Sequence, residues 1–234
     1  MLDPTIIFED DSFFVVEKPS GWITNEAGTT TSQPVLQTWM KENFDYPLKN
    51  NREARDGIVH RLDKETSGIL LVAKTQEAFE ELQRQFKERL VHKTYIALVH
   101  GKVEKSEGVI NETVGRLPWR RDRFGVLPDG RDAVTNYKRS LLLRSKNNED
   151  YTLLELNPES GRTHQIRIHL KHIGHPIVGD EFYAGRKTAR KDRRWCNRLF
   201  LHAGGIAFLH PVTKAGVKFS SPLPEDLTDI LKSI

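Results

Sequence analysis

Segments typical of β-strands follow one another directly along much of this chain, and this order constrains the fold more than any other feature. Near the N-terminus, the turn at residues 10–12 separates strand-like residues 6–8 from residues 13–16, which predicts a hairpin. Residues 133–143 and 151–156 predict a second antiparallel pair around the polar tip at 145–150. Strands do not alternate strictly with helices, which disfavours a doubly wound parallel sheet. The order predicts an α+β fold with a mixed, mostly antiparallel sheet flanked by helices.

Helical periodicity is confined to a few segments between these strands. After Thr75, a plausible N-cap, Phe79, Leu82, Phe86 and Leu90 recur at helical spacing and predict one buried helix face. The other expected elements are helices at 34–44, 165–173 and 225–234, and strands at 69–73, 94–99, 200–209 and 216–220. Residues 45–56 are polar and predict a flexible connector, without a domain boundary.

The positive charge of the chain is concentrated in two segments. The net charge is only +4, but residues 186–194 contain six basic residues and one acidic, and residues 116–123 contain four basic and one acidic. Each segment also includes a tryptophan or ends next to one, Trp119 and Trp195, and aromatic rings beside arginines suit unpaired bases. Two solvated basic loops are the alternative. The candidate RNA-backbone contacts are Arg116, Arg120, Arg121, Arg123, Arg186, Lys187, Arg190, Lys191, Arg193 and Arg194.

Several classes of protein are disfavoured by what the sequence lacks. No stretch approaches the roughly 20 apolar residues of a membrane span, and the first residues do not follow the pattern of a signal peptide. The single cysteine, Cys196, excludes an internal disulfide. We therefore expect a cytoplasmic protein, without a membrane partner.

Cofactor sites also find no support. His164, His169, His172 and His175 cluster, but their spacings and the absence of an intervening carboxylate do not match a helical zinc site, so we expect no metal. Phosphate-binding and dinucleotide glycine patterns are missing, and Ser67 and Cys196 have no recognisable catalytic partners. We expect no cofactor, and no nucleotide cofactor in particular.

Residues 57–74, GIVHRLDKETSGILLVAK, form the densest polar segment between two apolar runs. Thr66, Ser67 and Gly68 supply the small residues that a turn between strands needs. The turn does not require the preceding His60-Arg61-Leu62-Asp63, and loops held by a sheet commonly carry reactive groups. Asp63 is therefore a candidate catalytic carboxylate, with a structural salt bridge as the alternative.

A second polar segment, residues 160–169, offers several hydrogen-bond donors. If it is helical, Thr163 and Arg167 share a face. One useful arrangement pairs Arg167 with Asp63 and keeps that carboxylate ionised and oriented. The alternative is that the arginines of this segment lie separately on the surface.

Residues 57–74 closely resemble the catalytic motif of the RluA-type (RluA/RluD-like) pseudouridine synthases, in which HRLD is followed by TSG and a run ending in AK. Four further parts of the chain resemble family motifs in the same order: residues 18–21, residues 93–97, residues 161–167 together with 174–180, and residues 199–203. The resemblance spans nearly the whole chain. It implies the pseudouridine synthase catalytic fold, a single catalytic domain over residues 1–234, and an isomerase that converts uridine in RNA to pseudouridine.

The resemblance also implies roles for individual residues. Asp63 would be the catalytic carboxylate, Arg167 would form an ion pair with it, and Tyr95 would stack beneath the target base. The reaction breaks the N1–C1′ bond and rejoins the uracil through C5. A carboxylate can serve it either by attacking C1′ or by abstracting a sugar proton, and both routes stay open.

Access to the target requires that its base leave the stack. The resemblance implies that Arg61 fills the space left by the flipped nucleotide. It also implies that Ile166 and Leu201 form the apolar wall of the uracil pocket.

The expected partner is RNA, bound by a monomer. Many relatives carry an N-terminal S4 RNA-binding module, and this chain begins directly at the catalytic part, so RNA affinity is expected from the two basic segments. The motifs favour 23S-type rRNA, with tRNA as the alternative substrate. Two other classes stay open: a non-catalytic RNA-binding assembly factor, and a hydrolase of small substrates that uses Asp63 with a histidine.

Overall fold

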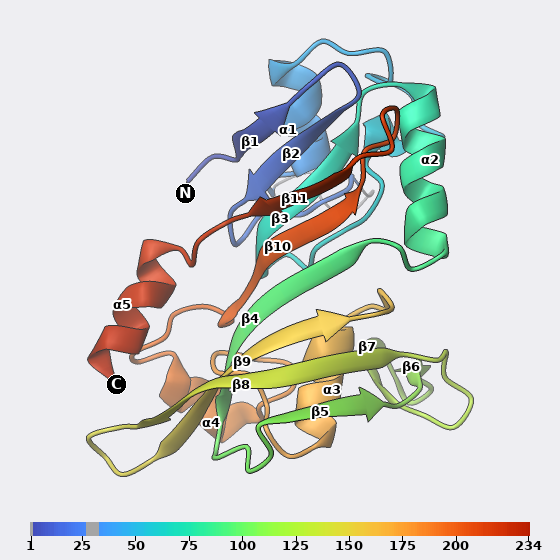
Figure 1. The fold of residues 1–234 in the computed structure, drawn as a ribbon. Coiled ribbons are helices and arrows are strands. Elements are labelled where there is room, and N and C mark those ends of the chain that lie inside the picture. The colour runs from blue at the N-terminus through green and yellow to red at the C-terminus, as the bar shows by residue number, and fades with distance from the viewer. Residues whose placement is uncertain (1, 27–32) are drawn as a thin grey trace. The chain divides into compact units, whose positions relative to one another are not determined.

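The computed structural model describes residues 2–26 and 33–234, apart from the Arg121 side chain. These residues divide into two compact units, whose helices and strands Figure 1 labels. Unit 1 comprises Met1–His92 and Ala203–Ser221, and unit 2 comprises Lys93–His202 and Pro222–Ile234. A single catalytic domain over residues 1–234 stays a prediction.

Unit 1 is built around strands whose order is β1-β2-β3-β10, with β11 beside β10. The predicted N-terminal hairpin is confirmed, because β1 pairs with β2 in antiparallel register. Every residue of β3 is buried, as its apolar run predicts for a strand covered on both faces. The strands are β1 (Thr5–Glu9), β2 (Phe13–Lys18), β3 (Ser67–Ala73), β10 (Leu201–Leu209) and β11 (Gly216–Ser220).

Helix α2 (Gln76–Lys87) of unit 1 begins where the sequence predicts. The Thr75 hydroxyl accepts a hydrogen bond from the Ala78 amide at 3.2 Å, so the predicted N-cap is confirmed. Phe79 and Leu82 are buried on one face. The prediction is wrong for Leu90, which follows the end of the helix and is 40% exposed.

Residues 45–56 are packed, and the prediction of a flexible connector is wrong. Tyr46, Leu48 and Asp56 are buried. The Tyr46 hydroxyl donates to the Asp56 carbonyl at 2.9 Å, and Gln37 Nε2 donates to Asp56 Oδ2 at 2.6 Å. Widely spaced apolar residues hold this segment, and such spacing leaves no periodic signal. The segment runs from α1 (Leu36–Asn43) to the short helix η1 (Arg55–Gly57).

Unit 2 contains strands in the order β4-β9-β8-β5 and a separate two-stranded sheet, β6-β7. The predicted pairing of residues 133–143 with 151–156 is confirmed by the antiparallel register of β8 with β9. Strands β5, β6 and β7 are not predicted by the sequence. The bounds are β4 (His92–His100), β5 (Glu107–Asn111), β6 (Val114–Leu117), β7 (Arg120–Val126), β8 (Val134–Arg144) and β9 (Asp150–Pro158).

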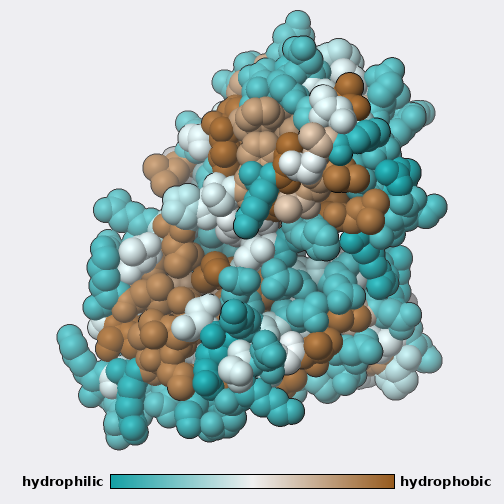
Figure 2. Space-filling model, viewed as in Figure 1, coloured by the Kyte–Doolittle hydropathy of each residue, from teal (hydrophilic) through white to brown (hydrophobic). Residues whose placement is uncertain are grey.

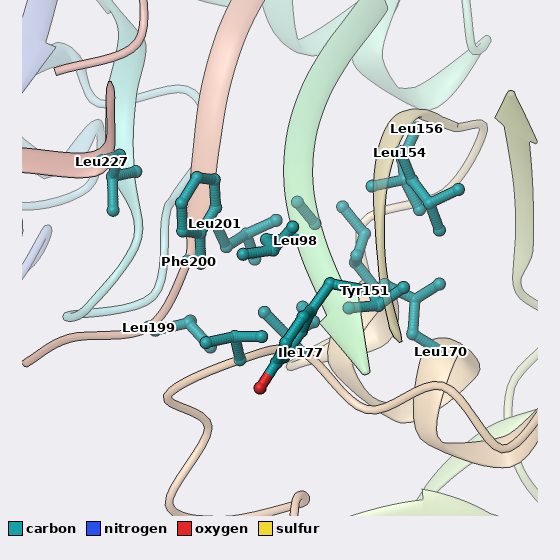
Figure 3. Packing of buried hydrophobic residues seen from close by; sticks show 14 of the residues in the cluster. Leu98, Tyr151, Leu154, Leu156, Leu170, Ile177, Leu199, Phe200, Leu201 and Leu227 are labelled. Carbon is teal, nitrogen blue, oxygen red and sulfur yellow. The ribbon is translucent and has the colours of Figure 1, made fainter. Parts of the chain in front are cut away.

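Three helices complete unit 2: α3 (Gln165–His172), α4 (Arg186–Asp192) and α5 (Glu225–Ser233). The core gathers leucines, isoleucines and aromatic rings from β4, β9, α3 and α5, as Figure 3 shows. Leu227 and Ile230 attach α5 to this core, while Leu231 and Ile234 are only partly buried. Hydrophobic residues therefore show at the surface beside α5 (Figure 2).

The α+β prediction is confirmed, because antiparallel strand pairs and helices occur in each unit. Antiparallel pairs in the described part of the chain include β1–β2, β2–β3, β4–β9, β5–β8, β6–β7, β8–β9 and β10–β11. Among the described residues, no helix is both long enough and apolar enough to cross a membrane.

Candidate active site

The turn that carries Asp63 spans residues 63–66 in unit 1. The Asp63 carbonyl accepts a hydrogen bond from the Thr66 amide at 3.1 Å, and the Asp63 side chain is half-buried. Of the three residues predicted to supply the turn, Thr66 closes it, whereas the prediction is wrong for Ser67 and Gly68, which already belong to β3. Gly68 has φ 118°, and a Cβ there would lie 2.3 Å from the carbonyl oxygen of Ala203. The glycine is needed for close approach of two backbones.

Lys18 holds this turn through a hydrogen bond to its backbone. It is fully buried at the end of β2, and its ammonium donates to the carbonyls of Trp22 at 2.9 Å and Lys64 at 3.2 Å. The Gly21 amide donates to the same Lys64 carbonyl at 2.8 Å. A buried lysine that binds loop carbonyls fixes the backbone next to Asp63.

Two hydroxyl groups hold the turn on either side of Asp63. Ser20 Oγ donates to the Glu65 carbonyl at 2.8 Å. Thr24 Oγ1 donates to the Leu62 carbonyl at 2.9 Å and accepts from the Leu62 amide at 3.2 Å. The backbone of residues 62–65 is thus tied to residues 18–24, so the segment Lys18-Pro19-Ser20-Gly21 and its neighbours hold the backbone that carries Asp63.

His60 has a structural role in the same segment. Its Nε2 accepts a hydrogen bond from the Leu71 amide at 3.0 Å, and its ring lies 4.8 Å from that of Phe86. A ring nitrogen that accepts from an amide does not carry a proton. Nε2 is therefore occupied in holding β3 and is not placed as a general base. Arg61, the next residue, is exposed.

Arg167 lies on α3 in unit 2 and is almost completely buried. Its Nε and Nη2 donate to the two carboxylate oxygens of Asp180 at 2.8 and 2.9 Å, which is a bidentate pair. Asp180 Oδ1 also accepts from the amides of Phe182 and Tyr183 at 2.9 and 3.0 Å. This arrangement fixes the plane of the guanidinium group.

Asp180 is a site residue to which the sequence assigns no individual role, although it ends the motif at residues 161–167 and 174–180. The pair with Asp180 uses two of the five N–H donors of the Arg167 guanidinium. The Arg167 side chain can therefore also donate to a second carboxylate. Asp63 belongs to unit 1 and Arg167 to unit 2, and their ion pair stays a prediction.

Helix α3 begins after Thr163, so Thr163 and Arg167 are not on one helix. His164 adopts a left-handed conformation with φ 55°, and its Nδ1 lies 2.9 Å from the Tyr183 hydroxyl. The helix starts at Gln165, so Thr163 lies outside it and the condition for sharing a helical face with Arg167 is not met.

Three residues expected around the uracil meet at one apolar cluster of unit 2. Ile166 and Leu201 are buried in it, and Tyr95 of β4 is partly buried against it. Their roles in binding the base stay predictions.

Lys93 lies two residues before Tyr95 on the same face of β4 and has no role in the sequence-based prediction. The group is half-buried, its Nζ donates to the Ser160 carbonyl at 3.4 Å, and burial lowers the pKa of its ammonium group to about 8. An ammonium group is strongly hydrated in the unfolded chain, so holding it here costs stability below the lowered pKa.

The Lys93→Met variant is expected to have a higher free energy of unfolding than wild type at pH 7, by about 1–2 kcal/mol. Unfolded lysine keeps its proton up to its ordinary pKa, whereas folded Lys93 loses it near pH 8. The advantage of the variant should therefore shrink as the pH rises from 8 toward 10. Urea titrations of both proteins at pH 7 and pH 9.5 measure the difference in their free energies of unfolding. The same difference at the two pH values would contradict the prediction.

The clustered histidines contact different parts of unit 2. His169 Nδ1 lies 2.9 Å from Thr135 Oγ1, and burial is the main cause that lowers its pKa. His175 Nδ1 lies 2.9 Å from the carbonyl oxygen of His100. Within residues 2–26 and 33–234, no group of three or more histidine, cysteine or carboxylate side chains is arranged to hold a metal ion.

The two basic segments form regular structure rather than loops. Residues of the first lie on hairpin β6–β7, where the guanidinium of Arg116 lies 4.9 Å from the Phe124 ring and that of Arg123 lies 5.1 Å from the Phe182 ring. Arg120 pairs with Asp122 at 3.2 Å. The Arg121 side chain lies outside the described part of the structure.

The second basic segment forms α4 and the turn after it. Arg193 pairs with Glu181 at 2.7 Å, and Lys191 pairs with Glu149. The other basic residues of this segment, Arg186, Lys187, Arg190 and Arg194, are exposed.

Comparison with known proteins gives one consistent answer. The model of the family described as RNA pseudouridylate synthase matches residues 12–172. The chain is 39% identical over 233 residues to the "Uncharacterized RNA pseudouridine synthase YlyB" of Bacillus subtilis, covering 100% of this chain and 73% of that protein. It is 37% identical to the "Ribosomal large subunit pseudouridine synthase D" of Nitrosomonas europaea, covering 98% of this chain and 64% of that protein.

Solved structures agree with these sequence matches. "Human RNA Pseudouridylate Synthase Domain Containing 1" superimposes with a TM-score of 0.77 at 26% identity, covering 97% of this chain and 87% of that one. The fold and the sequence matches together define an RNA-modifying isomerase. The chain belongs to the RNA pseudouridylate synthase family, whose members convert uridine to pseudouridine.

Proposed function

We propose that this protein isomerises specific uridines of large-subunit ribosomal RNA to pseudouridine. The observation that carries this substrate is the 37% identity, over 98% of the chain, with a relative named as a large-subunit synthase. Comparable relatives in Pasteurella multocida and Xanthomonas campestris bear the same name. The chain spans only 64% of the Nitrosomonas protein, so the rRNA substrate is a proposal for this chain. The tRNA alternative has no comparable support.

Asp63 is proposed as the carboxylate that acts at the ribose. The N1–C1′ bond breaks, the uracil turns, and C5 joins C1′. The proton of C5 then passes to solvent, and N1 takes up a proton in its place. The carboxylate serves either as the nucleophile at C1′ or as the base that removes a sugar proton. Support comes from the contacts of Lys18, Ser20 and Thr24, which hold the backbone on both sides of Asp63.

The remaining site residues are proposed to bind and orient the nucleotide. Tyr95 stacks beneath the base, and Ile166 and Leu201 form the apolar wall of its pocket. Arg61, an exposed side chain next to the turn, occupies the space left by the flipped nucleotide. Arg167, held in one plane by Asp180, is proposed to orient Asp63.

The basic segments are proposed to contact the RNA backbone, and the protein is proposed to act as a cytoplasmic monomer. Replacing Arg186, Lys187 and Arg190 of α4 by Gln should weaken RNA binding about equally for all sequences. The slope of log affinity against log salt should fall by about 0.7–0.9 for each phosphate that the variant no longer binds. Filter binding between 50 and 300 mM KCl measures the slope, and an unchanged slope would remove α4 from the interface.

The substrate proposal is tested by mapping pseudouridine in cells. A deletion strain is compared with the same strain carrying the wild-type gene, using carbodiimide modification and primer extension across large-subunit rRNA and pooled tRNA. We expect one or a few rRNA positions to lose their signal in the deletion strain and regain it on complementation. If the pseudouridine signal is lost only in tRNA, the rRNA substrate is wrong, while the proposed reaction stands.

A further inference from the structure

A pocket of about 320 Å³ opens in unit 2 beside the tip of hairpin β8–β9. In Figure 1 this tip and the end of α5 lie on the same side of the unit. The volume is at the lower end of the range of small-molecule sites and suits a single heterocyclic base. Its lining includes Lys146, Glu149, Tyr151, Lys191, Arg194 and Trp195.

The aromatic side of this pocket is held in place by the core. Trp195 packs edge-to-face on Tyr151, with ring centroids 5.3 Å apart. Tyr151 is 3% exposed, and its hydroxyl points out of the packed leucines (Figure 3) and donates to Glu149 at 3.2 Å. The Trp195 amide donates to the Asp192 carbonyl at 2.9 Å. The indole is thus a preorganised surface for stacking.

Asp192 anchors the chain just before Trp195. Its carboxylate is fully buried, accepts from the Gly179 amide at 2.9 Å and lies 3.0 Å from Nε2 of His100. A buried, hydrogen-bonded carboxylate resists movement of the turn that follows α4. The position of Trp195 therefore does not depend on a bound ligand.

The charged side of the pocket has a surplus of positive charge. Glu149 is paired with Lys191, and the hydrogen bond from Lys191 is the main cause that lowers the Glu149 pKa. Lys146 and Arg194 are exposed, and in the described part of the chain no carboxylate lies within ion-pair distance of either. An aromatic ring beside two such cations is the combination that binds unpaired nucleotides.

The pocket is separate from the proposed base-binding end of unit 2. In the register of β4 with β9, Tyr95 pairs with Leu156, whereas His100 pairs with Tyr151. Five residues of strand separate the two ends, which is about 17 Å. A nucleotide in this pocket would therefore be a different one from the target uridine.

We propose that this pocket binds one unpaired nucleotide of the RNA substrate, with its base stacked on Trp195 and its phosphate contacted by Lys146 and Arg194. The proposal rests on the proposed function, because it requires an RNA substrate. It makes the pocket a determinant of which RNA is bound and leaves the chemical step unchanged.

The first test replaces Trp195 by Ala and by Phe. Tritium release from RNA labelled at C5 of uridine gives kcat and KM, and filter binding gives the dissociation constant separately. For Trp195→Ala we expect KM and the dissociation constant to rise about 5- to 100-fold, with kcat within about twofold of wild type. Trp195→Phe keeps a stacking ring and should lie close to wild type. An unchanged KM in a folded Trp195→Ala protein would overturn the proposal.

The second test avoids the core contacts of Trp195. The double variant Lys146→Gln/Arg194→Gln is compared with Lys105→Gln/Lys232→Gln, which removes the same charge from exposed sites outside the pocket. The pocket variant should lower the salt slope by about 0.7, since both cations contact the same phosphate and each single-strand phosphate contact contributes about 0.7. Equal slopes in the two variants would overturn the phosphate contacts.

Failure of the pocket and failure of the proposed function give different results. If wild type releases tritium and every pocket variant behaves like wild type, the pocket proposal is wrong and the proposed function stands. If wild type binds RNA but never releases tritium, the proposed function is wrong. The dissociation constants of the variants then still show whether the pocket binds RNA.

Discussion

Replacing Asp63 by Asn is expected to lower the single-turnover rate of pseudouridine formation by about 10⁴-fold or more. Asparagine has nearly the shape of aspartate, but its amide is neither a nucleophile for C1′ nor a base for a sugar proton. Loss of a group that bonds to, or takes a proton from, the reacting atoms has effects of this order. The measurement is tritium release with enzyme in excess over labelled RNA.

The expected loss must be separated from unfolding and from loss of binding. The backbone of the turn is held through Lys18, Ser20 and Thr24, so the variant should melt within a few degrees of wild type and bind RNA with a similar dissociation constant. Asp45→Asn, at a 98% exposed carboxylate, is the matched control and should keep full activity. A folded Asp63→Asn protein with more than a tenth of the wild-type rate would contradict the assignment.

The Asp180→Asn substitution is expected to cost about 3–5 kcal/mol of folding free energy. It leaves the buried guanidinium of Arg167 without its bidentate carboxylate, and an uncompensated buried charge is strongly destabilising. Two backbone amides, of Phe182 and Tyr183, would also depend on a weaker acceptor. Urea denaturation followed by circular dichroism measures the loss.

The neighbouring residue provides a matched control for Asp180. Glu181 pairs with Arg193 at 2.7 Å on the surface, so Glu181→Gln should cost less than about 1 kcal/mol. Arg167→Lys should fall between the two, because it keeps the charge and loses one of the parallel hydrogen bonds. Equal stability of Asp180→Asn and Glu181→Gln would show that the buried pair contributes little.

The parts of the fold that sequence predicts well are those with a local signal. The N-terminal hairpin has a polar turn between two apolar runs, and α2 has Thr75 followed by Phe79 and Leu82 at helical spacing. Strand β7 and helix α4 lack such a signal, because charged residues dominate both. Helix α4 is only seven residues long, and its attachment through Asp192 to Gly179 and His100 is a tertiary contact that no local pattern contains.

The site follows the same division. Asp63 and Arg167 stand out by residue type, whereas Asp180, which orients Arg167, lies 13 residues further along the chain. In the sequence, Lys18 only marks where a predicted strand ends. Its hydrogen bond to the Lys64 carbonyl is evident only in the folded structure. Glycine at position 68 suggests a turn, yet its function is close approach to Ala203, which requires knowledge of the neighbouring strand.

The most direct test of the proposed reaction uses purified protein and large-subunit rRNA labelled with tritium at C5 of uridine, taken from cells that lack the gene. Wild type is predicted to release tritium up to a small whole number of equivalents per rRNA molecule, and to release little from tRNA prepared in the same way. Absence of release from every RNA, by a folded protein that binds RNA, would contradict the central claim.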